Sequence, residues 1–160
     1  MAESRRRVRG PLRTAAAVLV VPHELAHVLP AAAAGLTYRL TLLPEWEGSA
    51  DPLWRFDADL DEESPLWLVR LVAVAPTPVF LGVALALRLS GTVSGTTALV
   101  AAMLCALWGT LSAGDLAVAL APSEARDAGE FLVRGRPGTQ QAADALAVLT
   151  TLIVAGVLLL

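Results

Sequence analysis

The hydrophobic pattern of the chain is dominated by four long and nearly uninterrupted apolar runs. They cover about residues 12–36, 66–89, 97–121 and 142–160. Each run is close to the roughly 20 residues that a helix needs to cross about 30 Å of hydrocarbon. The apolar residues are continuous and do not alternate with polar ones, so helices fit these runs better than the strands of a membrane barrel. The pattern therefore predicts an all-α membrane protein with four transmembrane helices.

The longest polar segment, residues 37–65, lies between the first two apolar runs. Its stretches TYRLTLLP and LWRFDADL partly alternate apolar and polar residues, and the turn-prone EGSADP separates them. This arrangement predicts a short β-hairpin inserted between helices 1 and 2. The polar segment 122–141 contains SEARDAGEFLVRG, which favours a short surface helix. We expect residues 1–160 to form a single integral membrane domain.

Composition supports a membrane setting. Hydrophobic residues make up 56% of the chain and charged residues 17%, and a soluble domain of this size could not bury so much apolar surface. The single cysteine, Cys105, excludes an internal disulfide and a cysteine cluster for metal. All basic residues are arginine, which indicates a GC-rich prokaryotic genome such as that of a halophilic archaeon or an actinobacterium. We expect a multi-pass protein of the cell membrane. Its surroundings are the lipid bilayer, and we expect no nucleic acid partner.

Arginines also suggest an orientation. Five of the twelve precede Leu19, and the positive-inside rule then places the N-terminus in the cytoplasm. Four spans would return the C-terminus to the same side. The apolar run behind these arginines contains a histidine-rich motif that a cleaved signal would not need, so we expect the first run to be retained.

The motif is His23-Glu24-Leu25-Ala26-His27, an H-E-x-x-H pattern. Residues four apart lie on one face of a helix, so both imidazoles can reach a single Zn²⁺ at roughly 2.0–2.1 Å. Glu24 lies one position further round, where it can take a proton from a metal-bound water. A charged residue inside a membrane helix costs roughly 2.5–3.5 kcal/mol on insertion scales, which argues for a functional role of Glu24.

A catalytic zinc site needs a third protein ligand, and Asp115 is the leading candidate. It is the only acid in the third apolar run and would carry a similar penalty if it had no partner. Gly114 and Gly109 would allow another helix to approach closely. Ser112, three residues before Asp115, is a candidate hydrogen-bond partner for that ligand, although a serine in a helix often bonds its own backbone.

The alternative third ligand is Glu45 or Glu47, which follow His27 by 18 and 20 residues. Soluble zinc peptidases of the H-E-x-x-H type use a downstream glutamate in this way. Both residues lie in the polar segment beside Trp46, where acids are usually solvated. Asp115 is therefore favoured on the cost of leaving it unpaired in lipid.

Prolines predict where the helices bend. Pro76 and Pro78 lie in the middle of the second apolar run, and a proline inside a helix removes a hydrogen bond and kinks it. Pro22 and Pro30 bracket the motif and could either start a helical segment or bend one.

The combination of H-E-x-x-H in one membrane helix with an aspartate in a later one resembles the site-2 protease group of intramembrane metalloproteases. The similarity is to the small putative zincin peptidases of this group, and it extends over the HELAH helix, the hairpin insertion, AVAPTPVFLG and Gly114-Asp115-Leu116. The group's Asn-Pro and Leu-Asp-Gly elements are absent as such. The resemblance implies that His23, His27 and Asp115 bind zinc and that Glu24 is the general base.

The leading hypothesis is thus a zinc-dependent intramembrane endopeptidase that acts on a membrane-embedded or membrane-proximal protein substrate. The predicted hairpin offers an edge on which an extended substrate could pair as an added strand. The second hypothesis is a non-catalytic zinc-binding membrane protein with a regulatory or metal-handling role. Loss of an activity in a Glu24→Gln variant that still binds zinc would separate the two.

Overall fold

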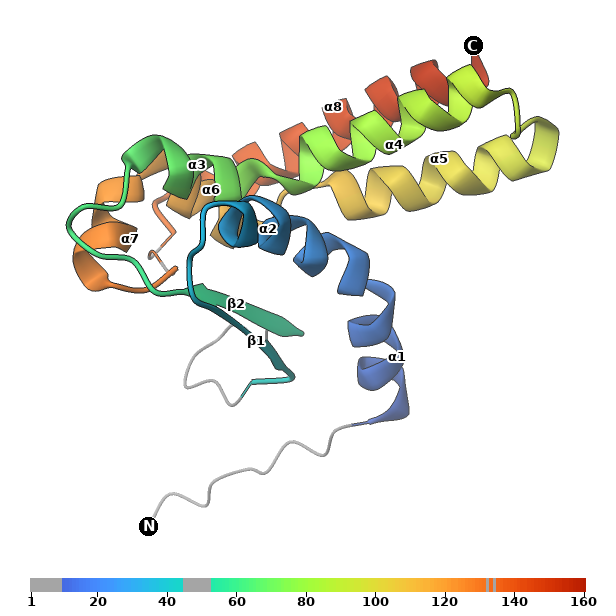
Figure 1. Ribbon diagram of the computed structural model, residues 1–160. Helices are drawn as coiled ribbons and strands as arrows, with labels where there is room; N and C mark the ends of the chain where they lie inside the picture. Colours follow the sequence, from blue (N-terminus) through green and yellow to red (C-terminus); the bar gives the residue numbers. More distant parts are fainter. Residues whose placement is uncertain (1–9, 45–52, 132, 134) are drawn as a thin grey trace.

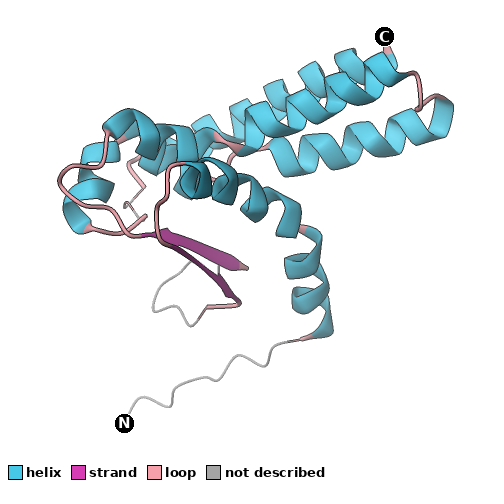
Figure 2. Cartoon of the chain, viewed as in Figure 1, coloured by secondary structure: helices cyan, strands magenta, loops and turns pink. Residues whose placement is uncertain are grey.

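The computed structural model describes residues 10–44, 53–131, 133 and 135–160. This part of the chain contains eight helices and one two-stranded hairpin after the second helix (Figure 1, Figure 2). The predominance of helices and the position of the hairpin confirm the predicted mostly helical fold with a hairpin between the first two apolar runs. The helices are α1 (Pro11–Leu19), α2 (Val21–Ala33), α3 (Leu66–Val74), α4 (Pro76–Ser90), α5 (Gly95–Gly109), α6 (Ala113–Leu120), α7 (Pro122–Ala128) and α8 (Thr139–Leu159).

Three of the four predicted spans are bent pairs of helices. The axes change direction by 43° between α1 and α2, by 51° between α3 and α4, and by 49° between α5 and α6. The fourth span, α8, is continuous, and among the described helices it alone is long and apolar enough to cross a membrane by itself. The number rises to four if each bent pair counts as one span.

Prolines account for two of the bends. Pro76 is the first residue of α4, which confirms the predicted kink in the second run. Pro22 lies in the first turn of α2, directly after the bend at Val20, whereas Pro30 lies inside α2 without ending it. Because proline has no N–H group, it is tolerated in a first turn and disrupts the preceding helix.

The third apolar run breaks without a proline. The prediction of a continuous helix over 97–121 is wrong here, because α5 ends at Gly109 and α6 begins at Ala113. Ser112 and Asp115 form a capping box, in which each side chain accepts a hydrogen bond from the other residue's backbone N–H. This local pairing starts a new helix where hydropathy alone predicts a continuous one.

The hairpin pairs β1 (Tyr38–Leu42) with β2 (Trp54–Ala58) in antiparallel register, with Leu40 opposite Phe56. Phe56 and Ala58 are buried and pack in a cluster with apolar residues of α3. The predicted turn EGSADP lies at residues 47–52, outside the described residues.

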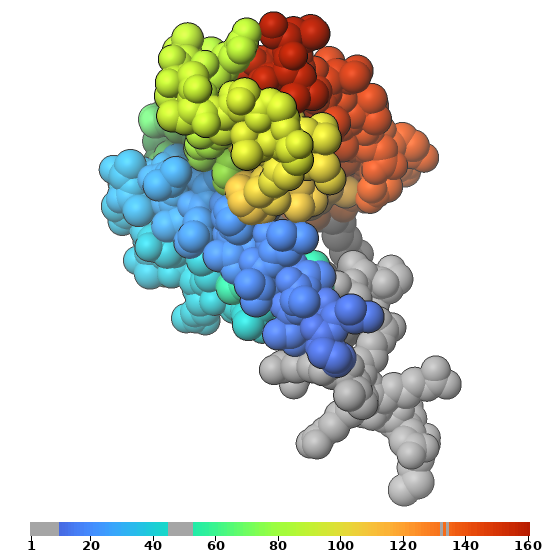
Figure 3. All heavy atoms as spheres, turned by 90° about the vertical axis from the view of Figure 1, so that its right-hand side faces the viewer, coloured from blue at the N-terminus to red at the C-terminus, as the bar shows by residue number. Residues whose placement is uncertain are grey.

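Helices α4, α5 and α8 lie side by side and form a three-helix bundle that extends from one end of the molecule (Figure 1). Figure 3 views the far end of this bundle, with α1 and α2 below it. At the near end the bundle meets α2, α3 and α6, and α7 and the hairpin lie beyond these helices, while α1 projects away from the bundle. α7 confirms, over 122–128, the predicted short helix in the segment before the last span.

The bundle exposes much of its apolar surface. One stretch of α8 carries large hydrophobic side chains that are about half exposed or more, namely Val148, Leu149, Leu152 and Ile153. The interior of the bundle contains small residues of α4 and α5, namely Ala84, Ala102, Cys105 and Ala106, which pack in one cluster with Val154 and Leu158 of α8. Cys105 therefore lies in the bundle core, as expected for a small apolar residue.

Candidate metal centre

His23 and His27 lie one helical turn apart on α2, and both side chains are buried. Their Nε2 atoms are 3.3 Å from each other. Asp115, in the first turn of α6, places Oδ2 3.4 Å from Nε2 of His23 and Oδ1 3.4 Å from Nε2 of His27. The structure thus brings together three residues that are separated in the sequence by up to 92 positions (115 − 23).

Two main-chain carbonyls determine which imidazole nitrogens carry hydrogen. Nδ1 of His23 is 2.9 Å from the carbonyl oxygen of Trp108, and Nδ1 of His27 is 2.7 Å from that of Val72. A carbonyl oxygen only accepts hydrogen bonds, so both Nδ1 atoms must donate. In the neutral imidazole each Nε2 then presents a lone pair.

These lone pairs point toward one another and toward a carboxylate. Both Nε2 atoms and both oxygens of ionised Asp115 are acceptors, and they approach to 3.3–3.4 Å without a donor between them. Such a cluster repels itself unless a proton or a metal cation lies between these atoms. His23, His27 and Asp115 could therefore together hold a metal ion.

Asp115 is held in place by the start of its own helix. The backbone N–H of Ser112 donates to Oδ2 of Asp115 at 2.8 Å, and the backbone N–H of Asp115 donates to Oγ of Ser112 at 3.1 Å. Both expectations for Ser112 are met in part, because its main chain bonds the carboxylate while its hydroxyl bonds the helix backbone. A carboxylate at a helix N-terminus is also stabilised by the helix dipole.

Glu24 follows His23 in the first turn of α2 and is partly buried. It is near enough to His23 and Asp115 for their charges to act on it. The predicted base therefore directly follows one candidate ligand, His23, and lies within electrostatic range of another, Asp115.

Aromatic rings from the hairpin and from the segment after α7 cover the buried side of the site. The ring of His27 lies 5.6 Å from that of Phe56 and 6.5 Å from that of Phe131, centre to centre. Phe56 and Phe131 contact each other edge to face at 5.1 Å. The rings of Phe56 and Phe131 shield His27 from solvent on that side.

One feature of the site differs from the sequence analysis, and one alternative is not tested. The close helix approach occurs at Gly109, where an added Cβ would lie 3.3 Å from Cβ of Phe80, and not at Gly114, where it would meet only Oγ of Ser112 at 3.5 Å. Glu45 and Glu47, the alternative third ligands, lie outside the described residues.

The carbonyls of Val72 and Trp108 were not foreseen. Backbone acceptors leave no residue-type signature in a sequence, although Pro76 indicates that the carbonyl four residues before it has lost its helical partner.

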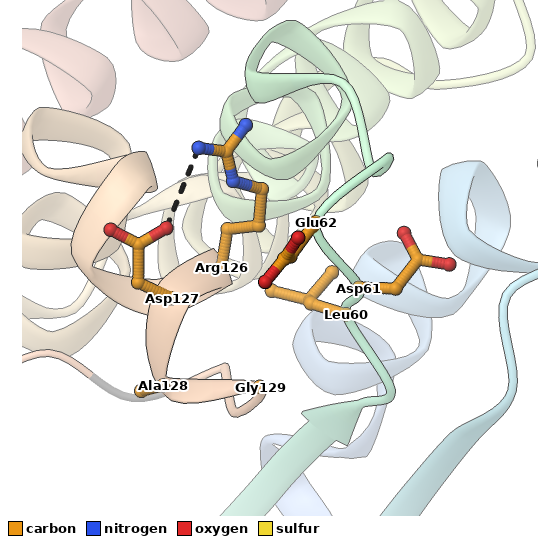
Figure 4. Close-up of a pocket in the computed structure, with 7 residues that line it drawn as sticks. All are labelled: Leu60, Asp61, Glu62, Arg126, Asp127, Ala128 and Gly129. Carbon is orange, nitrogen blue, oxygen red and sulfur yellow. Dashed lines mark hydrogen bonds and ion pairs between the residues drawn. The ribbon is translucent and has the colours of Figure 1, made fainter.

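A separate surface hollow of about 700 Å³ lies between the loop after β2 and the end of α7 (Figure 4). Its charged residues are of both signs, and Arg126 pairs with Asp127 at 3.4 Å. Asp61 accepts a hydrogen bond from the hydroxyl of Ser64, which lowers the pKa of its carboxyl group. Asp61, Glu62 and Asp127 are exposed to solvent, and we assign no ligand to this hollow.

Comparison with models of protein families, with curated proteins and with solved structures finds no match to this chain. Any functional inference therefore depends on the site itself.

Proposed function

We propose that this chain is a zinc-dependent endopeptidase of the membrane that hydrolyses peptide bonds in or near the bilayer. The observation that carries the proposal is the convergence of His23, His27 and Asp115 on one point, with Glu24 next to His23 in the first turn of α2. Two imidazoles and a carboxylate are the type of ligand set found at catalytic zinc sites, which keep a fourth position open.

The spacing of the ligands supports zinc. Two ligands that are each about 2.0–2.1 Å from a tetrahedral ion lie about 3.3–3.4 Å apart. The separations within the triad are 3.3, 3.4 and 3.4 Å. Because both Nδ1 atoms donate to carbonyls, the Nε2 atoms are already in the form that binds metal.

Glu24 is the residue of this chain that we assign to proton transfer. Zinc, when bound, supplies a Lewis acid for the scissile carbonyl and activates water. Glu24 accepts the proton of the attacking water and later delivers one to the leaving amine. His23 and His27 need only remain neutral and fixed, which their bonds to Trp108 and Val72 favour.

A membrane location follows from the exposed apolar surface of the bundle. The carbonyl of Leu160 accepts a hydrogen bond from Arg88, so the end of α4 lies beside the C-terminus. The hairpin and the segment after α7 meet elsewhere, where Arg55 pairs with Glu130 at 3.4 Å. This arrangement supports four spans in which the two longer connections share one side of the bilayer and the C-terminus lies on the other.

The hairpin offers a place for an extended substrate. Leu43 donates to Leu53 and Asp59 donates to Thr37, each at 2.9 Å, so these positions form the hydrogen-bonded pairs of the ladder. Bonded and non-bonded pairs alternate, and the backbone N–H of Leu42 therefore points away from β2. Near β2, the N–H of Phe131 donates to the side-chain carboxylate of Asp57, so the segment after α7 lies beside this strand. We therefore take the outer edge of β1 as the candidate docking strand.

A Glu24→Gln variant tests the proposal. Both proteins are placed in lipid vesicles with a fluorescently labelled single-span polypeptide whose helix contains a glycine-rich break. We expect one zinc per chain in both, cleavage by the wild type, and none by Glu24→Gln or after chelation. Equal zinc content with no cleavage by the wild type would instead support the non-catalytic metal-binding alternative.

A further inference from the structure

Each of the three helix bends leaves a carbonyl oxygen without its usual partner four residues later. Pro76 has no N–H for Val72, and the N–H of Ser112 goes to Asp115 instead of Trp108. The N–H of His23 bonds Val20 instead of Leu19. The N–H of Ala75 still reaches the carbonyl of Val72, at 3.4 Å. In lipid an unsatisfied carbonyl costs several kcal/mol, so donors from elsewhere in the chain are expected at all three bends.

The new donors come from other bent spans. The carbonyls of Val72 and Trp108 accept from His27 and His23. The carbonyl of Leu19 accepts from the indole N–H of Trp108 at 2.8 Å. The carbonyl of Gly109, the last residue of α5, accepts from the hydroxyl of Thr77 at 2.7 Å.

These four bonds close a ring around the triad. The first bend is joined to the third by Trp108, the third to the second by Thr77, and the second back to α2 by His27. Two of the bonds are made by the ligands themselves. The other two are made by residues that do not reach the metal position.

We infer that Thr77 and Trp108 are positioning residues that hold the two histidines and Asp115 at metal-binding distance. Thr77 fixes the end of α5 just before the turn that carries Asp115. Trp108 fixes the carbonyl that orients His23, because its indole is tied to the first span. This inference rests on the metal centre of the proposed function and concerns how tightly that centre binds.

The chain offers matched variants for both residues. Thr77→Val removes the hydroxyl with little change of shape, and Thr77→Ser keeps it. Thr151→Val is the control, since the hydroxyl of Thr151 also donates to a carbonyl, that of Ala147, but within α8. Trp108→Phe removes the indole N–H, and Trp67→Phe, at a tryptophan that is 64% exposed, is its control.

The experiment measures Zn²⁺ affinity by chelator competition and the visible absorption of the Co²⁺-loaded protein, on the full chain in lipid vesicles. Loss of a residue that orients a metal ligand typically weakens metal binding by about 10–100-fold. We expect a loss of this size, with an altered Co²⁺ spectrum, for Thr77→Val and Trp108→Phe. Thr77→Ser should stay within about threefold of the wild type, as should both controls.

Two results would overturn the inference. One is unchanged Zn²⁺ affinity and Co²⁺ spectrum in Thr77→Val and Trp108→Phe. The other is a lower unfolding temperature of the metal-free variants with unchanged affinity, which would show a merely structural role. Failure of the wild-type protein to bind Zn²⁺ would instead refute the metal centre itself, so the two proposals fail in different ways.

Discussion

The two ends of the molecule hold their helices together in different ways. In the three-helix bundle, α4, α5 and α8 run unbroken and pack through small side chains such as Ala84, Ala102 and Ala106. At the other end, three spans are bent and are joined by hydrogen bonds from side chains to backbone carbonyls. The bundle needs only close contact, whereas the bent end must also satisfy the polar groups that its bends expose.

The difference indicates where chemistry can be placed in an apolar chain. A straight helix satisfies its own backbone, and its polar side chains can find partners within the same helix, as Thr151 bonds the carbonyl of Ala147. A bend frees carbonyls that can hold an imidazole in one orientation, as those of Val72 and Trp108 hold His27 and His23. The bent end can therefore orient ligands, whereas the bundle is held together mainly by close packing.

The largest effect is expected for Asp115→Ala, which removes one ligand of the bent end and leaves the bundle intact. Zinc content should fall from one ion per chain to nearly none, because two imidazoles alone leave a catalytic site one ligand short. Metal analysis of the purified protein measures this change. Asp144→Ala is the control, since Asp144 lies on α8, where it accepts from Gln140.

The same measurement tests the alternative ligands. Full zinc in Asp115→Ala together with loss in Glu45→Ala or Glu47→Ala would transfer the third ligand to the polar segment. Asp115 would then need another reason to face two histidines.

A second variant probes the hairpin that covers the bent end. Leu42→Pro removes an N–H that points away from β2 and leaves the bonds between the strands in place, because proline is tolerated at such an edge position. We expect cleavage to fall by more than about tenfold with zinc still bound. The substrate loses one hydrogen bond, worth about 0.5–1.5 kcal/mol, and the proline ring also blocks the approach of a paired strand.

Leu42→Ala shortens the same side chain and keeps its N–H, so it should cleave normally. Leu40→Pro tests the next outward position and should behave like Leu42→Pro. Normal cleavage by both proline variants would mean that the substrate does not dock on β1.

Some elements of the bent end can be predicted from the sequence and others cannot. The H-E-x-x-H spacing, the lone acid Asp115 and the alternation around the hairpin led to these elements because each has a periodic or compositional signal. The break between Gly109 and Ala113 was missed because hydropathy averages over it. A local signal was present, since Ser112 and Asp115 have the spacing of a capping box.

The hydrogen-bond ring could not be predicted at all. Its acceptors are carbonyls, which every residue has, and its partners depend on how three spans meet in space. Only the effect of Pro76 on Val72 can be deduced from the chain itself.

The smallest effect is expected where the two regions join, at Gly109. An alanine there would place its Cβ 3.3 Å from Cβ of Phe80, 3.6 Å from Cγ2 of Thr150 and 3.8 Å from the carbonyl oxygen of Pro76. Overpacking of this kind costs about 1–3 kcal/mol. The better helix propensity of alanine offsets at most about 1 kcal/mol, and less at the last residue of a helix. Gly109→Ala should therefore lower the free energy of unfolding by about 1–2 kcal/mol.

Gly114→Ala should instead raise the free energy of unfolding, so the two alanine variants are expected to differ in sign. Its new Cβ meets only Oγ of Ser112, at an ordinary contact distance of 3.5 Å. The gain in helix propensity is then unopposed, and stability should rise by up to about 1 kcal/mol. Equilibrium unfolding of both variants in the same detergent and lipid mixture gives the comparison. Equal effects of the two substitutions on stability would contradict a close helix crossing at Gly109 between the bundle and the bent end. The predicted role of Gly114 in close helix packing would then be open again.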